Sequence, residues 1–67
     1  MNFNHEKLML MMLYNTGTRL GLIHELRLMQ CYLMPDETAL RELSEGVIEK
    51  LKLMTDAQFA EVEFPIN

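Results

Sequence analysis

Residues 8–14, with the sequence LMLMMLY, form an unbroken apolar run near the start of the chain. Asn4 as N-cap and Glu6 in the first turn predict a helix that begins just before this run. Phe3 and Leu8 occupy the positions of a hydrophobic staple, which supports the same start. Successive side chains of a helix point about 100° apart, so this helix would be apolar on every face. What covers such a helix in a chain of 67 residues is the main constraint on the fold.

A membrane is not expected to cover this segment. The run is far shorter than the roughly 20 residues that a membrane-spanning helix needs, and no basic segment precedes it as in a secretory signal. We therefore expect a cytoplasmic protein with no membrane partner. The chain has the length of one small helical domain, residues 1–67, and a domain of this size buries only about 60% of the surface that its unfolded chain exposes.

Few devices are available to stabilise so small a core. Cys31 is the only cysteine, which excludes an internal disulfide. His5, His24 and Cys31 do not supply the four ligands of a structural zinc site, so we expect no metal and no cofactor. Because small domains are commonly supported by a disulfide, a metal or a partner subunit, a partner subunit is the support that we expect.

The segment between the apolar run and Pro35 allows two interpretations. In the first, one long or kinked helix extends over about residues 5–33. In the second, Gly17 ends one helix and Thr18 caps the next. We favour the first, because apolar and small polar residues recur in steps of three and four with constant phase through residues 15–18. This stripe consists of Leu8, Met11, Asn15, Thr18, Leu22, Leu26, Met29 and Leu33.

The second half of the chain predicts two further helices. Pro35 marks a turn, and an apolar stripe on one face predicts a helix over about residues 36–54. Thr55 and Gln58 fit a capping box, which predicts a short helix over about residues 56–61. The remaining residues, 62–67, either dock on a neighbour or are disordered. The expected fold is all-α, a helical hairpin.

A continuous first helix would be longer than its partner. At 1.5 Å per residue it would run over about 40 Å, against about 27 Å for the second helix, so its apolar N-terminal end would overhang. A homodimer that forms an intertwined helical bundle would cover the overhang. The expected contacts with a second copy or another partner are Leu8, Met9, Leu10, Met11, Met12, Leu13, Tyr14, Gly17, Leu20 and Gly21. The expected core within one chain is Leu22, Leu26, Met29, Leu33, Leu40, Leu43, Val47, Leu51, Met54 and Phe59.

No residue pattern in the chain supports catalysis. His24 and Cys31 lie two helical turns apart, about 10 Å along the axis, which is too far for a Cys–His pair within one helix. We therefore predict no enzyme activity and no catalytic residue. The leading hypothesis is a protein-interaction module, a regulator, adaptor or inhibitor of another protein, of the bacterial or phage accessory type. Seven methionines suit such a role, because methionine is common on surfaces that adapt to a partner.

Two alternatives are retained. In the first, a DNA-associated regulator, dimerisation would gather Arg19, Arg27 and Arg41 into a basic patch. The formal net charge of −4 disfavours direct nucleic-acid binding. In the second, a redox-sensing protein, Cys31 would carry the function.

Overall fold

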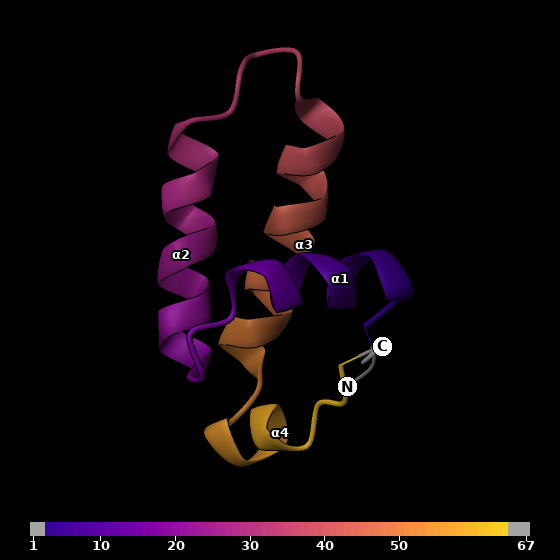
Figure 1. Ribbon diagram of the computed structural model, residues 1–67, viewed down its shortest axis with the longest axis vertical. Helices are drawn as coiled ribbons and strands as arrows, with labels where there is room; N and C mark the ends of the chain where they lie inside the picture. Colours follow the sequence, from indigo (N-terminus) through magenta and orange to yellow (C-terminus); the bar gives the residue numbers. More distant parts are fainter. Residues whose placement is uncertain (1–2, 65–67) are drawn as a thin grey trace.

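The chain folds as an antiparallel hairpin of two helices, which a third helix crosses and a short fourth helix closes at one end (Figure 1). A computed structural model describes residues 3–64. This part of the chain forms α1 (His5–Tyr14), α2 (Arg19–Cys31), α3 (Thr38–Leu53) and α4 (Asp56–Ala60). Helices α2 and α3 make the hairpin, α1 lies across it, and α4 lies at the end away from the connecting turn. The predicted all-α class is confirmed.

The favoured continuous first helix is wrong, because the chain breaks between Tyr14 and Arg19. Asn15 is extended, and its side-chain Oδ1 accepts a hydrogen bond of 2.9 Å from the Gly17 backbone N–H. Gly17 has a φ of 96°, in the left-handed region that glycine adopts at little cost. Thr18 then caps α2, because its Oγ1 accepts from the Gly21 N–H at 3.0 Å. Residues 15–18 therefore form a turn in which Asn15, Gly17 and Thr18 each have a defined role.

The core lies where α1, α2 and α3 meet. Val47, Ile48 and Leu51 of α3 face Leu22 and Leu26 of α2, and α1 completes the cluster from the side. The fully or almost fully buried apolar residues are Leu10, Met11, Leu22, Leu26, Val47, Ile48, Leu51 and Met54. A helix laid across the hairpin thus buries the inner side of the apolar run within the same chain.

The structure divides the expected core residues into two groups. Five of the ten are buried: Leu22, Leu26, Val47, Leu51 and Met54. Four others pack against the core but remain partly exposed: Met29, Leu40, Leu43 and Phe59. Leu33, beyond the end of α2, is also partly exposed. The partly exposed hairpin residues, Met29, Leu33, Leu40 and Leu43, lie in or beside the parts of α2 and α3 that are next to the connecting turn.

One polar contact joins the two helices of the hairpin inside this core. Ser44 is fully buried, and its hydroxyl accepts a hydrogen bond of 2.8 Å from Gln30 Nε2. The same hydroxyl donates to the Arg41 carbonyl at 2.9 Å. Because the hydroxyl both accepts and donates a hydrogen bond, Ser44 is buried with its polar group fully paired.

The other helix ends follow the expected signals closely. Asn4 caps α1 by accepting from the Lys7 N–H at 2.8 Å. Thr55 and Gln58 form the predicted capping box at the start of α4. Helix α3 begins at Thr38, two residues later than predicted. The reason is that Glu37 directs its carboxylate back to the Met34 N–H, at 2.8 Å, and so stabilises the turn before the helix.

Replacement of Gly17 by alanine tests whether the chain has a turn or a continuous helix at this position, because the two arrangements predict opposite changes in the free energy of unfolding. At a φ of 96° an alanine is strained, so we expect the free energy of unfolding to fall by about 1–2 kcal/mol. In a continuous helix the same change would raise it by about 1 kcal/mol. Urea unfolding followed by circular dichroism measures the difference, and a more stable variant would contradict the turn.

Gly46→Ala is the matched control for this experiment. Gly46 lies inside α3, and an added Cβ would meet only the flexible end of Lys7, with Nζ at 3.2 Å. We therefore expect the alanine at this position to leave stability unchanged or to raise it by up to about 1 kcal/mol through helix propensity.

Candidate functional site

The expected interface on α1 is divided by the crossing of this helix over the hairpin. Leu10 and Met11 lie in the core, with 7% and 0% of their surface exposed, so they are not available to a second copy. The overhang that suggested their role is absent, because α1 turns back over its own hairpin. Leu8 and Tyr14 are partly buried against the core. Three residues of the expected set remain exposed on one outer face of α1: Met9, Met12 and Leu13.

Gly17 and Gly21 serve the turn and not a helix crossing. Gly17 supplies the left-handed backbone, and nothing lies within 4 Å of the place where its Cβ would be. Gly21 is needed for space, because a Cβ there would overlap Thr16 Oγ1 and would lie 2.7 Å from Thr18 Oγ1. The lack of a side chain at Gly21 therefore lets Thr16 of the turn lie against the first turn of α2. Leu20, between the two glycines, is left 65% exposed.

Arg19 connects three helices at the end of the hairpin where α4 lies, away from the connecting turn. Its Nε donates to Asp56 Oδ1 in the first turn of α4 at 2.9 Å, which also makes an ion pair. Its terminal NH1 donates to the Leu51 carbonyl near the end of α3, also at 2.9 Å. The planar guanidinium suits two bonds in different directions. One side chain of α2 thus satisfies an unpaired C-terminal carbonyl of α3 and holds α4 in place.

A groove runs between the start of α2 and α4 with the segment that follows it. We call it the α2–α4 groove, and its volume is about 610 Å³. Arg19 and Asp56 form part of one wall, while Phe59, Val62 and Phe64 supply much of the apolar lining. The full lining consists of Gly17, Thr18, Arg19, Leu20, Asp56, Phe59, Ala60, Val62 and Phe64. Of the tail that was expected either to dock or to be disordered, Val62 and Phe64 line this groove, and residues 65–67 lie outside the described part of the chain.

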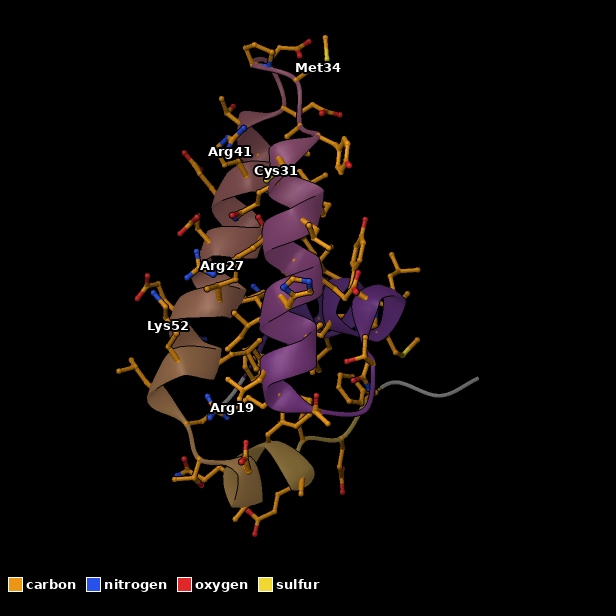
Figure 2. All side chains as sticks on the ribbon, turned by 90° about the vertical axis from the view of Figure 1, so that its left-hand side faces the viewer. Arg19, Arg27, Cys31, Met34, Arg41 and Lys52 are labelled. Carbon is orange, nitrogen blue, oxygen red and sulfur yellow. The ribbon has the colours of Figure 1, made fainter. Side chains whose placement is uncertain are left out.

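The predicted basic patch is only partly available. Figure 2 shows Arg19, Arg27, Arg41 and Lys52 along one side of the hairpin. Arg19 is engaged with Asp56, and Lys52 lies 3.8 Å from a carboxylate oxygen of Glu49. The arginines share this side within one chain, so grouping them does not require a dimer.

His24 and Cys31 do not form a site with each other. Both are exposed on α2, and Cys31 is a free thiol near the connecting turn. Within residues 3–64 no group of three or more His, Cys, Asp or Glu side chains is placed to hold a metal ion. In the same part of the chain, no helix combines the length and the apolar character needed to cross a membrane.

Sequence reasoning missed the roles of Arg19 and Ser44. Ser44 had a readable signal, since it falls on the apolar stripe of α3 between Leu40 and Val47 and therefore needed a buried partner. Arg19 had a weaker signal. A cation in the first turn of a helix opposes the helix dipole, which indicates that its charge is used elsewhere. Neither signal could identify the partner of the side chain. The partner of Arg19, Asp56, lies 37 residues away from it in the sequence.

Comparison with known families gives one match that covers almost the whole chain. A family model described as "Putative transposon-transfer assisting protein" (TTRAP) matches residues 3–65. No curated protein and no solved structure matches the chain.

Arg19→Met tests the connection between the three helices. The variant keeps much of the apolar stem but leaves the part-buried Leu51 carbonyl without its donor, so we expect a loss of about 1.5–3 kcal/mol in the free energy of unfolding. Asp56→Asn is the comparison. The Asp56 side chain is 81% exposed, and exposed ion pairs contribute only about 0–1 kcal/mol. Equal losses in urea unfolding would show that the ion pair with Asp56, and not the bond to the Leu51 carbonyl, accounts for the stabilisation by Arg19.

Proposed function

Since this chain belongs to the TTRAP family, we propose that it is a small non-enzymatic accessory protein that assists transposon transfer by binding another protein in the bacterial cytoplasm. An assisting role favours an adaptor or regulator over an inhibitor. The family match supports the accessory role, and the surface of the chain supports the binding role.

The observation that carries the binding role is the number of large apolar side chains that the core leaves outside. Leu13 of α1 and Leu20 of α2 are 78% and 65% exposed, and Tyr32 after α2 is 83% exposed. Single exposed apolar residues are common, but aromatic, methionine and leucine side chains gathered on a small domain are typical of binding surfaces. The interior of the described chain has a packed apolar cluster, so these residues are available for contact with other molecules.

We further propose that the outer face of α1 packs against a second copy of the chain. Met9, Met12 and Leu13 are spaced three and four residues apart and so share one helix face. A two-fold axis beside α1 would place this face against itself. The reason differs from the overhang expected from the sequence, because only the outer side of α1 is now available.

The accessory role is tested by transfer of a mobile element that encodes this chain. Deletion of the coding sequence should lower the frequency of transfer between cells, and expression of the wild-type chain from a plasmid should restore it. An unchanged transfer frequency after deletion would contradict the proposed function. Replication of the element within the donor, measured in parallel, serves as the control.

The second copy is tested by Leu13→Lys. Sedimentation equilibrium at low micromolar concentration should give a dimer for the wild-type chain and a monomer for the variant. Leu13 is largely exposed and lies in the last turn of α1, where a cation is favourable, so the helix should persist. Leu53→Lys makes the same change at an equally exposed last-turn position of α3 and should leave the dimer intact. A wild-type monomer would overturn this proposal.

A further inference from the structure

We propose that the α2–α4 groove binds a basic amphipathic helix of a partner protein. The inference rests on the proposed function, because it names the surface and the kind of partner through which an accessory protein would act. It is carried by the apolar lining of the groove, by the charges around it and by the way its walls are held.

The lining of the groove is apolar and accessible. Leu20 projects from the first turn of α2 with 65% of its surface exposed, and Phe59 of α4 is partly buried. After α4 the chain alternates: Val62 and Phe64 are partly buried and line the groove, whereas Glu61 and Glu63 are exposed. Two aromatic rings with aliphatic neighbours make a surface that fits the apolar face of a helix.

The charges at the groove are predominantly negative. Asp56 lies in its wall, and Glu61 and Glu63 alternate with the lining residues of the following segment. The one cation of the lining, Arg19, is only 17% exposed and is bonded to Asp56 and to the Leu51 carbonyl. The charges of Arg19 and Asp56 offset each other, so the exposed carboxylates of Glu61 and Glu63, which flank the lining residue Val62 in the sequence, make the net charge beside the groove negative. We call these two glutamates the acidic rim. A partner with lysine or arginine beside its apolar residues is complementary to this arrangement, whereas an acidic partner or nucleic acid is repelled.

The size of the groove fits several anchoring side chains. Its volume of about 610 Å³ lies within the range of about 300–1,000 Å³ that is usual for binding sites. The groove is open to solvent along one side, so an extended element such as a helix can lie in it. Ala60 contributes a small side chain to the lining, which leaves room at that point.

The walls of the groove are held before any partner arrives. Arg19 ties α4 to both α2 and α3, and the Thr55–Gln58 capping box fixes the start of α4. Binding to such a preformed surface loses less conformational entropy than binding to a mobile one. The walls that α2 and α4 supply are therefore held in a fixed relation to each other.

A titration of the ¹⁵N-labelled full chain with synthetic peptides tests the proposal. The probe is a helix of about 18 residues, five turns, with leucine on one face and lysine on the other. Two companion peptides replace every lysine by glutamate or scramble the leucine positions. We expect saturable binding of the lysine peptide alone, with amide shift changes concentrated at residues 17–20 and 56–64. Absence of saturable binding, or equal binding of either companion, would overturn the proposal.

Variants locate the peptide. Leu20→Lys should weaken binding roughly tenfold or more, as expected for a central apolar contact, whereas Leu53→Lys, the same change outside the groove lining, should have little effect. Glu63→Lys should weaken binding more than Glu45→Lys, an exposed α3 glutamate outside the groove lining. Equal effects within either pair would overturn the proposal. A second hollow is lined by Glu6, Ala39, Leu40, Glu42 and Leu43, and shift changes centred there would also overturn the proposal. Concentration-dependent shifts at the α2–α4 groove without peptide would overturn it too, because they would indicate a second copy of the chain there.

The transfer assay distinguishes failure of this inference from failure of the proposed function. If deletion of the chain lowers transfer but Leu20→Lys supports normal transfer, the accessory role stands and the groove is not the contact. If deletion has no effect on transfer, the accessory role fails, while the peptide titration still decides whether the groove binds a basic helix.

Discussion

The fold depends on the turn at residues 15–18. If the chain continued as a helix through this segment, α1 would project beyond the hairpin, and its apolar side chains would need another molecule. Gly17 instead adopts a left-handed conformation. Its own N–H donates to the Asn15 side chain, and the Gly21 N–H donates to the Thr18 side chain. The reversal lays α1 across α2 and α3, so that Met11 becomes as deeply buried as Leu22. The backbone conformation of this one turn thus decides whether the apolar run is buried in the core of its own chain or exposed to another molecule.

Much of the helical architecture was predictable from the sequence, because it depends on local signals. The caps at Asn4 and Thr55, the turn at Pro35 and the apolar stripe of α3 all appear where expected. The continuity of the first helix was predicted wrongly for a specific reason. A periodic stripe shows which face of a helix is buried, and not whether two stretches with the same phase belong to one helix. Met11 and Leu22 keep phase because both helices face the same core, and the turn between them happens to preserve the spacing.

The candidate site was less predictable, because it depends on contacts between distant residues. Leu20 was expected at an interface, but the groove beside it is formed with α4 and the segment after it, and Arg19 ties α4 to α2 through Asp56. Nothing in the spacing of these residues indicates that they meet. The tail presented a similar difficulty. Alternation of acidic and apolar residues after α4 has a meaning only once Val62 and Phe64 are known to line a groove.

The position of α1 also changes what the exposed apolar residues imply. A chain whose apolar run lacked cover would need a second copy in order to fold, and its interface would resemble a domain core cut in half. Here the inner side of α1 is covered by the same chain, so the outer side chains need not contribute to folding. Exposed leucine and methionine then oppose solubility without serving the core, and the role that we propose for them is binding. The two surfaces differ in character, since the α1 face is apolar whereas the α2–α4 groove combines an apolar floor with an acidic rim. A self-complementary contact suits the first, and a partner of opposite charge suits the second.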